Sequence, residues 1–114
     1  MNNIYFSMVQ FRETLKLFHF QCPTFAQHKA SDRLINSFDE KFDKFWELYQ
    51  GIYGRLTIES FSISINKKNL KEITKETIVI KLMLQSLKLE SDLSNIRDEI
   101  LGELNQFLYL LTFK

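Results

Sequence analysis

The stretch HFQCPTFAQHKASDRLINSFDEKFDKFWELYQGIYG, residues 19–54, contains the only proline of the chain and its longest uninterrupted helical pattern. Because a residue that precedes proline is pushed out of the α region, a helix that arrives at Cys22 has to end before Pro23. Thr24 and Gln27 then stand at the spacing of a capping box, in which two side chains satisfy free backbone N–H groups at a helix start. We therefore expect one helix to end and another to begin within these few residues.

The helix that begins at Phe25 should be long. No glycine or proline interrupts it before Gly51, and Gly51 and Gly54 are stop signals on either side of Tyr53. Its apolar residues recur every three or four positions, at Ile35, Phe38, Phe42, Phe45, Tyr49 and Ile52. At ~1.5 Å per residue such a helix spans roughly 40 Å, longer than most helices of globular proteins.

Three further segments show the same spacing of apolar residues. The first ends at Cys22 and has its stripe at Ile4, Met8, Phe11, Leu15 and Phe18. Another follows a capping box of Asn69 and Glu72 and has its stripe at Leu70, Ile73, Thr77, Ile80, Leu84 and Leu87. The last opens at Ser91 and Asp92 and has its stripe at Leu93, Ile96, Ile100, Leu104, Phe107 and Leu111.

Residues 55–66 are the one part of the chain with a strand-like pattern, because Phe61, Ile63 and Ile65 alternate with serines. A single strand has no partner, so we interpret this stretch as an extended crossover that lies over the helices. Short links within two helix pairs and a longer link between the pairs are typical of ferritin-like bundles. The expected fold class is therefore all-α, a ferritin-like antiparallel four-helix bundle with a crossover between helices two and three, and residues 1–114 form a single domain.

The composition excludes several classes of function. Of 114 residues, 45% are hydrophobic, and 15 lysines and arginines balance 14 acids, so the chain can bury one core but has no basic cluster for nucleic acid. No apolar run reaches the ~18 residues of a membrane span, and no leader pattern is present. The single cysteine, Cys22, cannot form a disulfide within the chain. We expect a cytoplasmic protein without a membrane or a sequence-specific nucleic-acid partner.

Four residues are candidates for chemistry. The only histidines, His19 and His28, lie nine residues apart on either side of Pro23, so the turn can bring their rings together. Asp43 and Glu47 are four residues apart and share one face of the long helix, where their oxygens can bind a cation. Each feature also has an ordinary explanation: a histidine satisfied by a hydrogen bond in a core or interface, and an acidic pair on a solvated face.

The order of these residues resembles that of the ferroxidase-site region in Dps proteins, the mini-ferritins. In that family a histidine closes the first helix, a Pro-x-Phe element leads to a second histidine, and an Asp and a Glu follow at offsets of 15 and 19. His19, His28, Asp43 and Glu47 fill all four positions. The resemblance implies that they bind a divalent metal, iron first, with manganese or zinc as alternatives. The resemblance is also compatible with ferroxidase activity, the oxidation of Fe(II).

A second resemblance covers nearly the whole chain and is to a small uncharacterised ferritin-like family found in phages and large DNA viruses. The matching stretches are His28-Lys29-Ala30, Asp43-Lys44-Phe45-Trp46-Glu47, Tyr49 to Arg55, Asn95 to Ile100 and Tyr109-Leu110-Leu111. This resemblance implies the ferritin-like fold, whereas the function of that family is not established.

The long helix decides how the four candidate ligands can meet. Fifteen residues from His28 to Asp43 correspond to roughly 22 Å of helical rise, whereas metal ligands lie ~2 Å from the ion. A shared site therefore needs the histidines of one chain and the acids of another, and a two-fold homodimer, or a higher homo-oligomer, would contain equivalent sites. The alternative is a non-catalytic helical structural or interaction module, viral or host-associated, in which these residues only line an interface.

Overall fold

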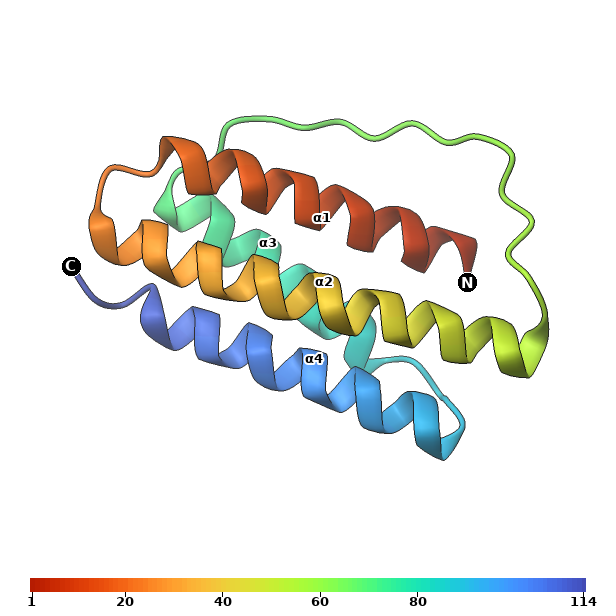
Figure 1. Cartoon of the computed structure of the whole chain (residues 1–114). Helices are drawn as coiled ribbons and strands as arrows, with labels where there is room; N and C mark the ends of the chain where they lie inside the picture. Colours follow the sequence, from red (N-terminus) through yellow and green to blue (C-terminus); the bar gives the residue numbers. More distant parts are fainter.

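The computed structural model describes residues 1–114 and contains four α-helices and no β-strand (Figure 1). The helices are α1 (Asn2–Gln21), α2 (Phe25–Tyr53), α3 (Leu70–Gln85) and α4 (Ser91–Leu110). The expectation of an all-α chain with four helices is therefore confirmed. The molecule measures 43 × 29 × 21 Å along its principal axes.

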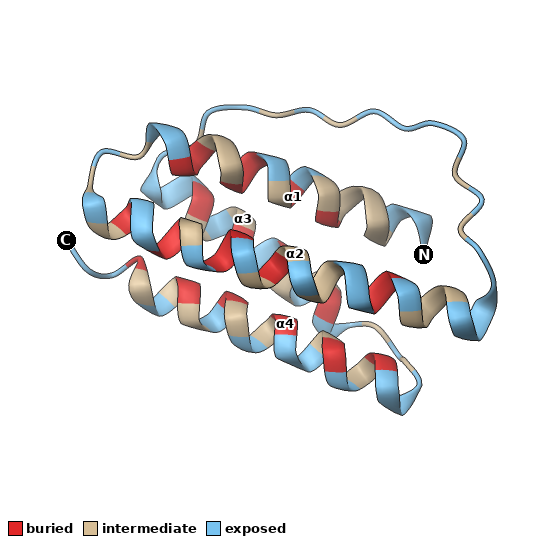
Figure 2. Cartoon of the chain, in the orientation of Figure 1, coloured by how far each residue is buried: buried red, intermediate tan, exposed pale blue.

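The four helices pack as a closed ring around one core. α1 contacts α2 and α3, and α4 contacts the same two helices, so α1 and α4 lie diagonally opposite each other. The buried positions of each helix recur along one side (Figure 2), and 19 buried apolar residues form one cluster. In α4 the whole expected stripe is buried. Burying a leucine or phenylalanine side chain stabilises a fold by ~1.5–3 kcal/mol, so this cluster is the main source of stability.

The buried face of α2 differs in part from the expected one. Ile52 is exposed, and Phe42 and Tyr49 are only half-buried, whereas Leu34 and Trp46 are buried. The last turns of α2 extend beyond the neighbouring helices (Figure 1). The length of α2 therefore exposes the end of its stripe, which the periodicity alone could not reveal.

The stripe expected for α3 is too long at both ends. Leu70, the first residue of the helix, is exposed, and the helix ends at Gln85, so Leu87 belongs to the link that follows. Leu87 is nevertheless partly buried against the core. The expected capping box at Asn69 and Glu72 is present with both of its hydrogen bonds.

The capping box expected at the start of α2 is only half formed. Thr24 accepts a hydrogen bond from the backbone N–H of Gln27 at 3.2 Å, as expected of an N-cap residue. The Gln27 side chain does not complete the box, because its Oε1 is buried without a partner. Thr24 alone therefore provides the side-chain cap of α2.

The link between α2 and α3, residues 54–69, is neither helix nor strand and passes along the outside of α1 (Figure 1). Its contacts are sparse but specific. The Phe61 ring stacks on Phe6 with ring centroids 4.6 Å apart, and the Ser64 N–H donates to Gln10 Oε1 at 3.2 Å. The strand-like alternation thus belongs to an extended segment that places the Phe61 ring on α1.

Arg97 of α4 holds the link between α3 and α4. Its Nη1 donates hydrogen bonds to the carbonyl oxygens of Leu84 and Leu87, at 2.9 and 2.8 Å. The last carbonyl groups of a helix have no partner within the helix, and a cation near a helix C-terminus is favourable. Arg97 therefore stabilises the end of α3 from the neighbouring helix.

Replacing Arg97 by methionine keeps an unbranched apolar stem and removes both hydrogen bonds. We expect the free energy of unfolding to fall by ~1.5–3 kcal/mol, the range for hydrogen bonds to charged groups. Urea denaturation followed by circular dichroism measures this change. Arg55→Met, at an exposed position, is the matched control and should change stability by less than about 0.5 kcal/mol. Equal effects of the two substitutions would contradict the role of Arg97.

Candidate metal centre

The turn between α1 and α2 brings the two histidines together. Only residues 22–24 link the helices, so the last turn of α1 lies beside the first turn of α2. The rings of His19 and His28 stack with centroids 4.0 Å apart and an angle of 23° between their planes. His19 is only 6% exposed, whereas His28 is exposed. At this end of the bundle one ring of the pair is therefore buried and the other is exposed.

Hydrogen bonds across this turn orient both rings. His28 Nδ1 lies 3.1 Å from the carbonyl oxygen of His19, and His19 Nδ1 lies 3.1 Å from the carbonyl oxygen of His28. A carbonyl oxygen only accepts, so in these bonds each Nδ1 carries a proton and donates. In a neutral ring the Nε2 atom then keeps its lone pair, which is the form in which histidine binds a metal.

Ser31 completes the turn and was not singled out by the sequence. It is fully buried, and its Oγ lies 3.0 Å from His19 Nδ1, from which it accepts a second, shared hydrogen bond. The same hydroxyl lies 2.8 Å from the carbonyl oxygen of Gln27 and 3.0 Å from that of His28. The only feature of the sequence that could have indicated this role is a serine three residues after a histidine. That feature is not specific, because serines inside helices commonly bond to the carbonyl groups of the preceding turn.

Cys22 lies in the same turn as a thiol with two backbone acceptors. Its Sγ lies 3.5 Å from the carbonyl oxygen of His19 and 3.8 Å from that of Thr24. Burial raises the pKa of the Cys22 thiol, whereas hydrogen bonds with the backbone of Cys22 and Thr24 act in the opposite direction. A raised pKa means less thiolate at a given pH, so Cys22 should be a weaker nucleophile than an unperturbed cysteine.

Asp43 and Glu47 lie in the other half of α2. Both are exposed, and neither takes part in any of the ion pairs within the chain. They border a hollow of about 330 Å³, whose other lining residues are Tyr5, Phe42, Trp46, Gln50 and Leu56. The Trp46 indole N–H is buried and has no hydrogen-bond acceptor. The two carboxylates are thus free to bind a cation that reaches the surface of α2.

Asp39, one turn before Asp43, serves the fold instead. The Arg12 guanidinium of α1 donates two hydrogen bonds to its carboxylate, at 3.0 and 2.9 Å. The hydrogen bond to Asp39 is the main reason that the pKa of Arg12 is raised. This ion pair links α1 to α2, whereas Asp43 and Glu47 have no ion-pair partner within the chain.

The four candidate ligands form two separate pairs in one chain. No group of three or more His, Cys, Asp or Glu side chains comes close enough to hold a metal ion. His28 and Asp43 lie on one continuous helix, so the rise of roughly 22 Å between them is fixed. The structure thus brings His19 to His28 and leaves Asp43 and Glu47 together elsewhere on α2.

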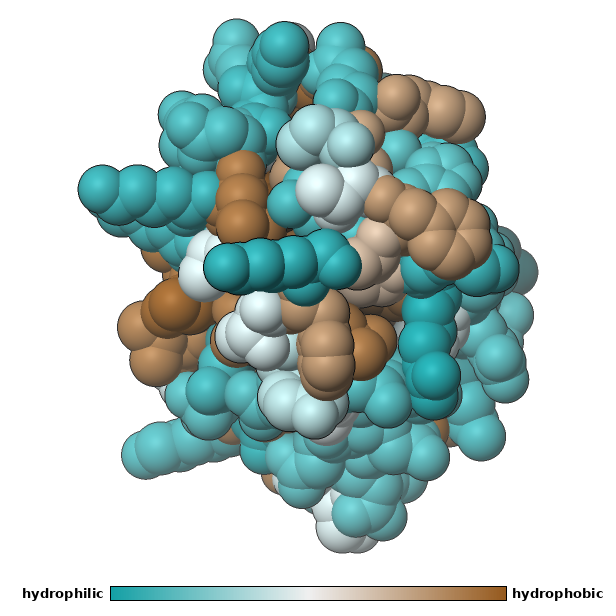
Figure 3. Space-filling model, turned by 90° about the vertical axis from the view of Figure 1, so that its left-hand side faces the viewer, coloured by the Kyte–Doolittle hydropathy of each residue, from teal (hydrophilic) through white to brown (hydrophobic).

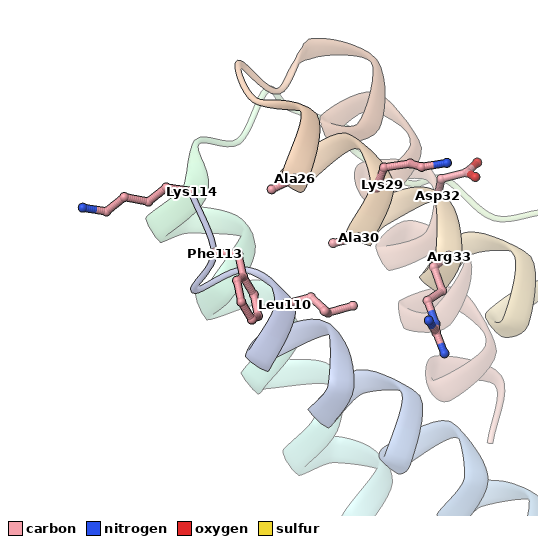
Figure 4. A pocket seen from close by; sticks show the side chains of 8 residues that line it. All are labelled: Ala26, Lys29, Ala30, Asp32, Arg33, Leu110, Phe113 and Lys114. Atoms are coloured by element: carbon pink, nitrogen blue, oxygen red, sulfur yellow. The ribbon is translucent and has the colours of Figure 1, made fainter.

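A hollow of about 620 Å³ lies between the start of α2 and the end of α4 (Figure 4). Its lining residues are Ala26, Lys29, Ala30, Asp32, Arg33, Leu110, Phe113 and Lys114. Figure 4 shows Arg33 directed toward α4, whereas Lys29 and Asp32 point away from it. This lining includes none of the four candidate ligands, so the hollow is a feature separate from both pairs.

Apolar side chains are exposed at the end of the bundle that carries the histidine turn (Figure 3). Phe20 and Phe25, on either side of the turn, are 70% and 74% exposed. The ammonium groups of Lys16 and Lys29 lie over these rings, 5.0 and 5.8 Å from their centroids. The histidine pair is therefore flanked by two aromatic rings that remain mostly exposed.

These features define an all-α protein of four helices that has a histidine pair at the start of its longest helix and a carboxylate pair further along. The chain belongs to a family of unknown function, DUF5856, whose model matches residues 19–111. The matched span begins at His19 and includes all four candidate ligands. No curated protein and no solved structure is significantly similar to the chain. Each of its helices is too short or too polar to cross a membrane.

The raised pKa of Cys22 predicts slow alkylation. Iodoacetamide attacks through the thiolate, so the native protein should react more slowly at pH 8 than an unperturbed cysteine, and its rate should rise at higher pH. Mass spectrometry of quenched samples measures the rate. The same protein in urea is the control and should react like a free thiol. A native rate equal to that in urea would contradict the burial of this group.

Proposed function

We propose that this chain is a ferritin-like protein that binds iron or a similar divalent metal at the interface of a homodimer. The proposed ligands are His19 and His28 of one copy and Asp43 and Glu47 of the other. One observation carries the proposal: each histidine donates Nδ1–H to a backbone carbonyl oxygen, which leaves two Nε2 lone pairs on one turn. Metal-binding histidines are almost always oriented by such a bond.

The arrangement of the helices supports the ferritin-like part of the proposal. α1 and α4 each adjoin both α2 and α3, and the long link 54–69 runs past α1 before α3 begins (Figure 1). One long crossover among short links is the pattern of ferritin-like bundles. The resemblances to Dps proteins and to the family found in phages and large DNA viruses favour the same fold.

The donor set fits a divalent transition metal. Imidazole nitrogen and carboxylate oxygen together suit Fe(II), Mn(II) or Zn(II). With Fe(II) as substrate, ferroxidase activity would transfer one electron from each ion to dioxygen or peroxide, and this activity is part of the proposal. The chain itself contributes the fixed ring orientation and two unpaired carboxylates. A cytoplasmic location without a nucleic-acid partner belongs to the same proposal.

A helical structural or interaction module is the second candidate. It is favoured by the burial of His19. The hydrogen bonds of His19 Nδ1 with His28 and Ser31 would stabilise the turn even without a bound metal. The exposed rings of Phe20 and Phe25 would then serve a protein partner. Metal binding separates the two candidates.

A stabilising effect of metal is the first test. Mn(II), Zn(II) or anaerobic Fe(II) should raise Tm, since a ligand that binds only the native state stabilises it by ~2.7 kcal/mol at a hundredfold excess over Kd. His28→Ala and Asp43→Ala should each abolish the gain, and Glu99→Ala, at an exposed acid of α4, should keep it. Scanning calorimetry and elemental analysis measure both effects. If His28→Ala and Asp43→Ala respond like the parent, the four-residue site is wrong and the structural module remains.

A mixed dimer tests whether the site is shared. One variant lacks both histidines (His19→Ala, His28→Ala) and the other lacks both acids (Asp43→Ala, Glu47→Ala), so neither homodimer should bind metal. In the mixed dimer one interface site joins intact histidines to intact acids, and about half of the parent's metal should return. Differential tags isolate the mixed dimer after subunit exchange. Absence of any recovery in folded mixed dimers would reject the shared geometry.

A further inference from the structure

The exposed face of α2 separates its charges along the helix. In the first half the exposed charged side chains are Lys29 and Arg33, next to His28. In the second half they are Glu40, Asp43 and Glu47, with Lys44 as the one exception. None of these residues takes part in an ion pair within the chain. Apart from Lys29, whose ammonium group lies over the Phe25 ring, the fold therefore leaves these charges without a partner.

The pattern is also unfavourable for the helix that carries it. A helix is stabilised by acids near its N-terminus and cations near its C-terminus, but α2 has no acid in its first turn and no basic residue in its last. Lys29 with Arg33 and Asp43 with Glu47 are like charges at i and i+4, which destabilise an isolated helix, whereas only Glu40 with Lys44 is a favourable exposed pair at this spacing. An arrangement that disfavours its own helix points to a partner that compensates for it.

We infer that this face of α2 binds the same face of a second copy, antiparallel to it, around a two-fold axis between Asn36 and Ser37. Arg33 and Glu40 are seven residues apart, about two helical turns, and so lie nearly in line along α2. A two-fold axis midway between them places Arg33 of each copy against Glu40 of the other. Two symmetric ion pairs then lie close to the axis.

The register set by these ion pairs is also the one that the candidate metal centre needs. Reflection of position 28 through the midpoint of Arg33 and Glu40 gives position 45, in the middle of the turn that holds Asp43 and Glu47. His28 of one copy therefore lies level with this acidic turn of the other along the helix axis, twice. The inference names the partner surface of the proposed metal site and to that extent rests on the proposed function, but its charge argument requires no metal.

Three charged residues of α2 depart from the pattern. Asp32 is half-buried and lies one turn from His28. Lys41 is half-buried, and Lys44 is exposed seven residues after Ser37, which donates a hydrogen bond to Glu103 of α4. Reflection through the same midpoint places Lys44 opposite Lys29 of the second copy, so this like-charge pair offsets part of the attraction. Phe25, 74% exposed on the same face, would be covered by the last turns of the partner's helix. Charge complementarity and this aromatic ring together fit a second copy of the chain.

Charge reversal tests the interface in the presence of a chelator, so that metal does not contribute. Arg33→Glu and Glu40→Arg should each weaken dimerisation at least about tenfold, because each creates two like-charge contacts across the axis. The double variant, and an equal mixture of the two single variants, should restore dimers, since both arrangements again oppose unlike charges. Sedimentation equilibrium measures the dissociation constants, and mass spectrometry identifies the mixed dimers. Lys75→Glu and Glu99→Arg, at exposed positions of α3 and α4, are the matched controls.

The outcomes separate this inference from the proposed function. A parent that remains monomeric in chelator at high concentration overturns the inference. So do single variants that dimerise like the parent, or a folded double variant that does not recover. If the charge swap behaves as expected while neither His28→Ala nor Asp43→Ala changes metal binding, only the metal proposal fails. If metal binds with the parent's affinity to a monomeric Arg33→Glu variant, the shared interface fails.

Discussion

Two hydrogen bonds across a three-residue turn hold the end of α1 against the start of α2. In each, the ring of one histidine donates to the backbone of the other's helix, so α1 and α2 cannot separate at this end without breaking both. Such bonds contribute ~0.5–1.5 kcal/mol each when formed, and more is lost when a buried partner stays unsatisfied. The turn thereby fixes the direction of α2, against which both α1 and α4 pack.

The length and stiffness of α2 then decide what the chain can do alone. Its 29 residues form one continuous helix, so side chains half a helix apart cannot approach one another. The oriented histidines stand at its start and the unpaired carboxylates stand in its second half. Any chemistry that needs both therefore has to come from two copies, whereas stapling the turn or binding an aromatic partner needs only one.

Much of the fold follows from local signals in the sequence. Pro23, the cap residues Thr24 and Asn69, and the stripe of α4 define where helices begin, end and turn inward. The exposure of Ile52 did not follow, because it depends on how far α2 outruns its neighbours, which is a tertiary property. Neither did the Arg97 contacts with the end of α3, since a hydrogen bond between helices leaves no periodic mark in the sequence.

The candidate site, too, could be predicted from the sequence only in part. Spacing around Pro23 was enough to bring His19 and His28 together, but the direction in which each ring donates could be read only from its backbone acceptor. The contact of Ser31 with His19 could not be predicted, because a buried serine in a helix has no distinctive sequence pattern.

A single rigid helix that carries residues of both pairs and the charges between them has a further physical consequence. A slip of one residue in an antiparallel pairing would move the facing side chains by ~1.5 Å along the helix and turn them by about 100°. Metal ligands tolerate errors of only ~0.2 Å in distance, so a shared centre needs a register held by something other than the metal. Paired charges near the axis act on both halves of a two-fold interface equally. Arg33 and Glu40 lie between the histidine turn and the acidic turn. Ion pairs between them would therefore fix the register of the two helices at the point where both metal sites depend on it.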